Sequence, residues 1–300
     1  MKRTDHRPGQ VTHTDIVTNG VRLHVALAGP PQGQPVFLLH GFPECWYGWR
    51  HQIVPLAEAG YRVVVPDQRG YNTSDKPPRL GDYTRDVLAA DVVGLMDHFG
   101  VERGLVVGHD WGGAVAWWLA CQRPERVARL AVLNLPHPIV FARALRTPRQ
   151  LLRSWYMLWF QVPWLPEAIL GRRGAAPLLD VLQRSTRPGA VSDEDLRVYR
   201  DAFMQPGALS AMLRWYRAAF FRPGARLAHP RLEMPCCLIW GKKDEVLGWE
   251  MAAPSMERCA DGRLFFLEDA GHFVQLDEPR RVAELLLDFF GAPAGVDHRP

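Results

Sequence analysis

Residues 104–113 read Gly-Leu-Val-Val-Gly-His-Asp-Trp-Gly-Gly, and they lead from a short apolar run through a turn of small residues into the apolar segment 114–121. Gly108, Asp110 and Gly112 form the pattern Gly-x-nucleophile-x-Gly, in which glycines leave room for a sharp strand-turn-helix. We therefore expect Asp110 at the tip of the turn, as a nucleophile. An aspartate at this position would equally suit a simple helix cap.

Short apolar runs rich in β-branched residues occur on both sides of this stretch. They are residues 36–39, 61–65, 105–107, 130–133, 236–240 and 264–267. Continuous rather than alternating apolar character indicates strands buried on both faces. Helical patterns lie between them, such as 88–99 after a cap at Thr84 and 282–289 after a cap at Asp277. The alternation predicts a mostly parallel sheet covered by helices.

Residues 138–230 interrupt this alternation. They contain no clear strand, many aromatic residues and leucines, and helical patterns broken by Pro and Gly. We interpret them as a helical cap domain inserted into a core domain made of residues 11–137 and 231–291, with disordered tails at 1–10 and 292–300. Because ligands of such sheets bind at the carboxyl ends of the strands, the cap would roof the site.

Three further segments supply partners for Asp110. Phe42 follows an apolar run, where its backbone N–H could form an oxyanion hole together with that of Trp111. Asp244 ends the first strand after the insertion, and His272 follows the next strand. The chain order of nucleophile, acid and histidine is the one this fold uses. Taken singly, Asp244 could be a loop cap and His272 an ordinary polar turn residue.

Three motifs carry a resemblance to a known family. The runs His40-Gly-Phe-Pro-Glu-Cys-Trp-Tyr-Gly-Trp-Arg50, Asp67-Gln-Arg-Gly-Tyr71 and His109-Asp-Trp-Gly-Gly113 closely resemble those of soluble epoxide hydrolases of the α/β-hydrolase superfamily, over about residues 20–290. The resemblance implies an α/β-hydrolase fold, with a mostly parallel eight-stranded sheet flanked by helices and an inserted helical cap. It also implies two cap tyrosines that hydrogen-bond the epoxide oxygen, and the similar segments 155–161 and 213–217 assign this role to Tyr156 and Tyr216.

The aromatic residues of the cap admit a second interpretation. Tyr156 and Tyr216 each share a helix face with other apolar residues, so packing alone would also explain them. We expect Trp111, Trp155 and Trp159 to bind substrate, although Trp155 and Trp159 fit the core equally well.

An aspartate nucleophile determines the expected reaction. A carboxylate with an ordinary pKa of ~3.9 is ionised at neutral pH and can attack a saturated carbon directly. The product would be an alkyl ester of Asp110, which His272, oriented by Asp244, would hydrolyse with water. The sequence thus predicts an epoxide hydrolase that converts lipophilic aryl or alkyl epoxides into vicinal diols. No serine occupies a Gly-x-Ser-x-Gly frame, which argues against ordinary esterases and lipases.

Two other functions remain open at this point. A haloalkane or haloacid dehalogenase would use the same triad, but haloalkane dehalogenases usually place Asn where this chain has Phe42, and fluoroacetate dehalogenases carry arginines where it has Trp111 and Ala114. A non-catalytic receptor for a small ligand could also be built on a hydrolase scaffold.

The overall composition limits the class of protein. The chain has 300 residues, of which 47% are hydrophobic and 23% charged, as in an ordinary soluble enzyme. The formal net charge of +4 is scattered, so we expect no nucleic-acid partner. The five cysteines lack metal or redox spacing, which predicts reduced thiols, no metal and no cofactor. Without a signal peptide or a spanning segment, we expect a cytoplasmic protein with no membrane partner, whose partners are an epoxide and water. A homodimer stays open.

Overall fold

An eight-stranded sheet forms the centre of the computed structural model, which describes residues 10–222 and 225–292. The strand order is β1-β2-β4-β3-β5-β6-β7-β8; β3 to β8 run parallel, whereas β2 pairs antiparallel with β1 and with β4. The strands are β1 (Thr12–Thr18), β2 (Val21–Ala28), β3 (Pro35–Leu39), β4 (Arg62–Pro66), β5 (Gly104–His109), β6 (Val127–Leu133), β7 (Cys236–Gly241) and β8 (Gly262–Leu267). This is the mostly parallel sheet that the sequence predicted.

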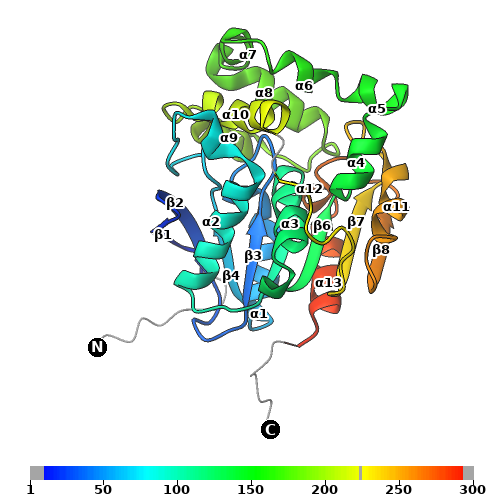
Figure 1. Cartoon of the computed structure of the whole chain (residues 1–300). Helices are drawn as coiled ribbons and strands as arrows, with labels where there is room; N and C mark the ends of the chain where they lie inside the picture. The colour runs from blue at the N-terminus through cyan, green and yellow to red at the C-terminus, as the bar shows by residue number, and fades with distance from the viewer. Residues whose placement is uncertain (1–9, 223–224, 293–300) are drawn as a thin grey trace.

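Helices cover both faces of the sheet (Figure 1). Those of the core are α1 (Arg50–Glu58), α2 (Arg85–His98), α3 (Trp111–Gln122), α11 (Ala252–Met256), α12 (Val274–Asp277) and α13 (Pro279–Phe290). In β3, Phe37 and Leu39 pack with residues of α2 and α3, whereas Val36 and Leu38 pack with residues of α1 and α13. All four side chains are fully buried, which is worth roughly 1.5–3 kcal/mol each and explains the continuous apolar sequence.

The hairpin of β1 and β2 was not among the individual runs identified from sequence. Only Ile16 of β1 is buried, so this edge strand lacks a continuous apolar run. Its turn consists of Asn19 and Gly20, whose φ angles are 46° and 74°. An Asn-Gly pair between two strands is a strong hairpin signal, and it could have located both strands.

The last helix does not begin at the predicted cap. Asp277 is the final residue of α12, and Glu278 occupies the N-cap position of α13. The Asp277 carboxylate instead accepts hydrogen bonds from the backbone N–H of Gly271 at 2.7 Å and of Arg187 at 2.7 Å. An acidic residue before Pro279 therefore fixes a neighbouring loop rather than the helix it precedes.

Seven helices lie between β6 and β7, above the ends of the parallel strands (Figure 1). They are α4 (Pro138–Ala144), α5 (Pro148–Arg153), α6 (Trp155–Trp159), α7 (Leu165–Leu170), α8 (Arg172–Arg184), α9 (Asp193–Phe203) and α10 (Ala208–Phe221). Within the described ranges, no helix has the length and apolar character required to cross a lipid bilayer. Residues 1–9 and 293–300, most of the two tails expected to be disordered, lie outside the described residues.

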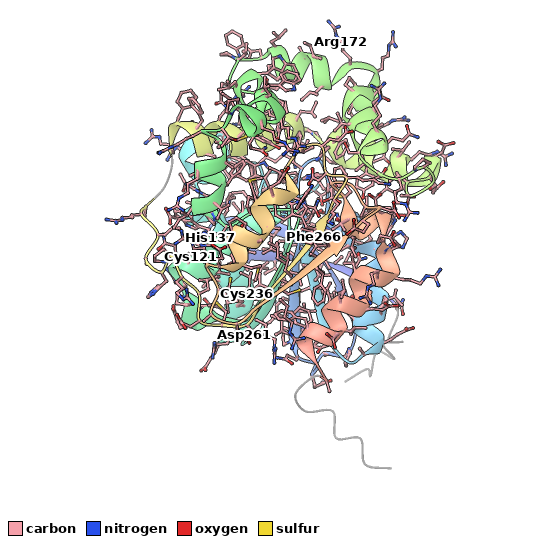
Figure 2. All side chains as sticks on the ribbon, turned by 90° about the vertical axis from the view of Figure 1, so that its right-hand side faces the viewer. Cys121, His137, Arg172, Cys236, Asp261 and Phe266 are labelled. Atoms are coloured by element: carbon pink, nitrogen blue, oxygen red, sulfur yellow. The ribbon has the colours of Figure 1, made fainter. Side chains whose placement is uncertain are left out.

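His137 joins the helical insertion to the core, close to Cys121 (Figure 2). The ring Nδ1 of His137 accepts a hydrogen bond from the Ile139 N–H at 3.3 Å, and the backbone N–H of His137 donates to Ser255 Oγ at 3.0 Å. Burial lowers the pKa of His137 to about 4, which keeps the ring neutral and able to accept. These contacts give His137 a packing role at this junction. All five cysteines are buried and unpaired.

Candidate active site

Asp110 lies at the sharp turn between β5 and α3. Its backbone φ is 47°, an unusual value for a residue with a side chain. A Cβ atom on Gly108 would lie 2.3 Å from the Gly112 oxygen, and one on Gly112 would lie 2.1 Å from the Leu39 oxygen, so only glycine fits either position. The Asp110 side chain makes no capping hydrogen bond to α3, which argues against the helix-cap interpretation.

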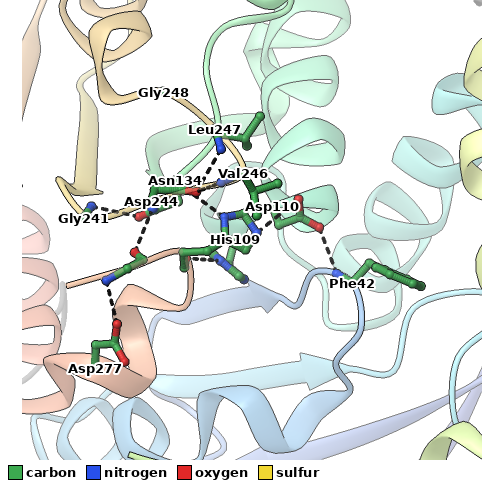
Figure 3. Close-up of polar contacts among 12 residues, drawn as sticks. Phe42, His109, Asp110, Asn134, Gly241, Asp244, Val246, Leu247, Gly248 and Asp277 are labelled. Carbon is green, nitrogen blue, oxygen red and sulfur yellow. Dashed lines mark hydrogen bonds and ion pairs between the residues drawn. The ribbon is translucent and has the colours of Figure 1, made fainter. Parts of the chain in front are cut away.

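The two carboxylate oxygens of Asp110 have different surroundings (Figure 3). Oδ1 accepts a hydrogen bond of 2.9 Å from the Phe42 N–H, on the loop that follows the neighbouring strand β3. Oδ2 lies 3.6 Å from His272 Nε2. The loop packs tightly here, since a Cβ on Gly41 would lie 2.5 Å from the Asp110 Cβ. One oxygen is thus held by a backbone donor, while the other faces the imidazole.

His272 and Asp244 form the rest of the predicted triad. The His272 Nδ1–H donates to Asp244 Oδ2 at 2.9 Å, and both side chains are almost fully buried. Burial opposes the charge on His272, but the negative charges of Asp244 and Asp110 outweigh it and raise the pKa of His272 to about 10. Although burial also acts against an ionised Asp110, His272 and the Phe42 N–H hold the pKa of that carboxyl below its usual value. The resting site therefore contains an imidazolium between two carboxylates.

Four donors hold the Asp244 carboxylate. Oδ1 accepts from the backbone N–H groups of Val246 and Leu247, each at 2.8 Å. Oδ2 accepts from His272 and also from the Asn134 side-chain amide at 2.7 Å. Because each oxygen of the carboxylate accepts two hydrogen bonds, the carboxylate has little freedom to rotate away from His272.

Asn134 is a site residue that the sequence analysis missed. It follows β6, its backbone φ is 46°, and its side chain is fully buried. Besides Asp244, its amide donates to the Gly271 carbonyl at 3.1 Å, and its carbonyl accepts from the Gly241 N–H at 3.2 Å. Asn134 therefore joins the acid loop to the histidine loop. The available signal was an asparagine directly after a buried parallel strand, where ligand-facing side chains collect.

A second buried pair lies beneath the triad. His109 Nδ1 is 2.8 Å from Glu44 Oε2, and His109 Nε2 is 2.9 Å from the His272 carbonyl. Glu44 Oε2 also accepts from the Gly41 N–H at 3.2 Å. Burial alone would raise the pKa of Glu44, but His109 lowers it below its usual value. The pair links the loop of Phe42 to the backbone of His272, which gives His109 and Glu44 a positioning role.

An apolar cavity of about 300 Å³ opens in front of Asp110. Tyr156 from α6 and Tyr216 from α10 line it, with their ring centroids 6.0 Å apart. Burial raises the pKa of Tyr156, and the charge of Asp110 raises it further. Burial also raises the pKa of Tyr216, with smaller contributions from Tyr156 and Asp110. Both phenols are therefore neutral hydrogen-bond donors. The structure brings together Asp110, His272, Asp244 and both tyrosines.

The three tryptophans expected to bind substrate differ in position. Trp111 lines the cavity, and its N–H is the first of α3, next to Asp110. Trp155 is 62% exposed, so it lies neither in the core nor at the cavity. Trp159 is half-buried against Trp155 and Phe160 and does not line the cavity. Tyr156 and Met157 of α6, together with Gln161 just beyond its end, line the cavity instead. A helix of five residues is too short for its inner face to be read from periodicity.

Metal ligation finds no support in the geometry. Across residues 10–222 and 225–292, no three or more His, Cys, Asp or Glu side chains are grouped so that they could hold a metal ion.

Comparison with known proteins places this geometry in a family. The profile of the alpha/beta hydrolase fold matches residues 34–279. The AB hydrolase superfamily protein YfhM of Bacillus subtilis is 45% identical over 276 residues, which cover 91% of this chain and 96% of that protein. Epoxide hydrolase 4 of Homo sapiens is 38% identical over 294 residues, which cover 95% and 80%. A crystal structure of the Bacillus megaterium epoxide hydrolase with an inhibitor has a TM-score of 0.86 and 31% identity, and the match covers 92% of this chain and 99% of that one. The chain therefore belongs to the epoxide hydrolases of the α/β-hydrolase fold.

Proposed function

We propose that this protein converts lipophilic aryl or alkyl epoxides and water into vicinal diols through a covalent ester of Asp110. The observation that carries the proposal is the asymmetric Asp110 carboxylate, with Oδ1 bound by the Phe42 N–H and Oδ2 beside His272, in front of an apolar cavity that Tyr156 and Tyr216 line. The epoxide hydrolases among its relatives support the activity itself.

In the first step, Asp110 Oδ2 attacks one ring carbon of the epoxide. The bond between that carbon and the ring oxygen breaks, and its electron pair moves to the oxygen. Tyr156 and Tyr216 hydrogen-bond this oxygen, and one of them transfers its proton to the alkoxide. Asp110 loses its charge when the ester forms, so one cause of the raised pKa of Tyr156 and Tyr216 disappears. The phenol thus becomes a better proton donor when the alkoxide forms.

In the second step, His272 acts as the base for water. The ester removes the Asp110 charge that helps to raise the pKa of His272, so the imidazolium becomes more acidic and returns a proton to the tyrosinate through water. Neutral His272 then deprotonates a water molecule that attacks the ester carbonyl. The N–H groups of Phe42 and Trp111 stabilise the oxyanion, each by ~3 kcal/mol. The leaving alkoxide takes the proton from His272 and departs as the diol. The Asp110 carboxylic acid then passes its proton to His272, which restores the carboxylate and the imidazolium of the resting site.

The helical insertion completes the proposed site. We assign residues 138–230 to a cap domain that supplies both tyrosines, and residues 11–137 and 231–291 to the core domain that supplies the triad. With the cap in place, the reacting atoms lie in an apolar cavity that limits the access of water to the alkoxide.

Product analysis tests the proposal. Purified protein is incubated with a panel of aryl and alkyl epoxides and, in parallel, with haloalkanes and fluoroacetate, and diol and halide are measured. We expect diol from the epoxides, and its complete loss in Asp110→Ala. Halide release without diol would indicate that the triad catalyses dehalogenation. Saturable binding without any turnover would indicate a receptor.

A further inference from the structure

The outer surface of the helical insertion carries an unusual concentration of exposed apolar side chains. Of the thirteen large hydrophobic side chains that are exposed among the described residues, seven lie between residues 151 and 165. We define the cap apolar patch as Leu152, Trp155, Leu158, Val162, Trp164 and Leu165. Trp164 is 83% exposed and Leu152 is 74% exposed, whereas a monomeric protein usually exposes such residues singly. The concentration indicates a binding surface.

The patch lies on one edge of the molecule. Helices α5, α6 and α7 follow one another along the top of the view in Figure 1, opposite the end where α13 finishes. Arg172, which follows α7, points outward at the same edge in Figure 2. A flat partner could therefore contact the patch without touching the core.

The segments that carry the patch are rich in arginine. Residues 138–173 contain six arginines, and Glu167 is the single acidic residue among them. Arg217 pairs with both carboxylate oxygens of Glu167, which cancels that charge. Arg149 pairs with Glu250, whereas no ion pair within the described part of the chain involves Arg143, Arg146, Arg172 or Arg173. The partner of this surface should therefore be apolar and negatively charged.

We propose that the cap apolar patch binds the surface of a lipid bilayer that contains anionic phospholipids. Exposed leucines and tryptophans bordered by arginines are the composition of segments that lie in the bilayer interface, where tryptophan is enriched and arginine attracts anionic headgroups. A second copy of the chain fits less well, because a symmetric dimer through this patch would bring two arginine-rich surfaces together. The lack of a spanning segment predicted no membrane partner, but binding at the surface of a bilayer requires no such segment.

Bilayer binding would bring the cavity close to lipophilic substrates, and this part of the inference rests on the proposed function. Helix α6 presents Tyr156 and Met157 to the cavity and Trp155 and Leu158 to solvent. Bilayer contact at α6 would place the cavity beside the apolar phase in which lipophilic epoxides dissolve. The inferred substrates are thus epoxides that partition into membranes. Bilayer binding itself requires no catalysis, so Asp110→Ala should bind vesicles as wild type does.

Vesicle sedimentation tests the proposal with the full chain. We expect binding to vesicles of phosphatidylcholine with one third phosphatidylglycerol, at least tenfold weaker binding to phosphatidylcholine alone, and a blue shift of tryptophan emission on binding. Leu152→Glu with Trp164→Glu should reduce binding more than tenfold. Val17→Glu is the matched control for Trp164→Glu alone, because the two side chains are 76% and 83% exposed and Val17 lies on β1, outside the patch.

A second pair of variants separates local charge from total charge. Arg172→Gln with Arg173→Gln should weaken binding about 20-fold, since each arginine near an anionic surface contributes about fivefold. Arg280→Gln with Arg281→Gln makes the same change in total charge on α13 and should leave binding unchanged. Melting temperature and turnover of a water-soluble epoxide confirm that each variant is folded.

Three results would overturn the proposal. The first is the absence of wild-type binding to the anionic vesicles. The second is equal loss of binding in the patch variants and in their controls. The third is a wild-type dimer by light scattering that Leu152→Glu with Trp164→Glu converts to a monomer, which would assign the patch to a second copy of the chain.

Discussion

Replacing Asn134 by Ala should slow hydrolysis of the proposed ester much more than its formation. The variant removes the 2.7 Å hydrogen bond to Asp244 Oδ2, the same oxygen that accepts from His272. A hydrogen bond to a charged group is worth about 1.5–3 kcal/mol, which corresponds to roughly 10- to 100-fold in rate. Losing this donor concentrates negative charge on Oδ2, so the pKa of His272 should rise further and less neutral base should form in the ester.

Rapid-mixing kinetics separate the two steps. Covalent adduct and diol are followed over time by intact mass and chemical quench between pH 6 and pH 10. We expect the alkylation rate to change less than threefold, the hydrolysis rate near neutral pH to fall 10- to 100-fold, and the midpoint of the pH dependence of hydrolysis to move upward. The sign follows from His272, which must lose a proton to act as a base.

Asn72→Ala is the matched control for this variant. Asn72 also has a positive φ, 42° against 46° for Asn134, and it also donates to a carboxylate at 2.7 Å, that of Asp67. Both variants therefore bear the same cost of about 1–2 kcal/mol for alanine in the left-handed region. Equal slowing of alkylation and hydrolysis in Asn134→Ala, or the same kinetic change in Asn72→Ala, would refute the reasoning.

Three further predictions address His272, the cap tyrosines and the turn that carries Asp110. His272→Gln treated with an epoxide should accumulate a covalent adduct, detectable by intact mass, because the step that needs a base is blocked; no adduct would contradict the two-step assignment. Tyr156→Phe with Tyr216→Phe should lower the alkylation rate at least 100-fold at unchanged melting temperature, and full activity would make both residues structural. Gly112→Ala should destabilise the fold by ~3 kcal/mol, measured by denaturant unfolding, because its Cβ would lie 2.1 Å from the Leu39 oxygen; stability within 1 kcal/mol of wild type would show that the turn can relax.

Burial explains which parts of the fold were predictable from sequence. Strands β3 to β7 lie inside the sheet, and each carries side chains in both hydrophobic clusters, so each leaves a continuous apolar run. The edge strand β1 has one buried side chain and leaves no such run. Asp277 precedes a helix that starts with proline, which is also the pattern of an N-cap, and only its contacts with Gly271 and Arg187 distinguish the two roles. Local sequence cannot separate a cap from a long-range hydrogen bond.

The site divides in the same way. Asp110, Asp244 and His272 each follow a strand of the parallel part of the sheet, so parallel topology alone brings them to one edge. The contacts that hold them in place cannot be read from local sequence, because Asn134 and Asp244 are 110 positions apart and His109 contacts a carbonyl 163 positions away. Trp155 failed as a pocket residue for a related reason. On a five-residue helix, the inner and outer faces depend on neighbouring helices rather than on periodicity.

The anchoring contacts also explain why hydrolysis should be the more sensitive step. Alkylation needs the Asp110 turn and a substrate in the cavity, and the turn is fixed by its own glycines. Hydrolysis needs the loops of Phe42, Asp244 and His272 in register at the same time. The buried pair of Glu44 and His109 links the Phe42 loop to the His272 loop. Asn134 links the Asp244 loop to the His272 loop. A change in the anchors of Asp244 and His272 displaces groups that serve the second step, so such variants should accumulate ester rather than lose the ability to form it.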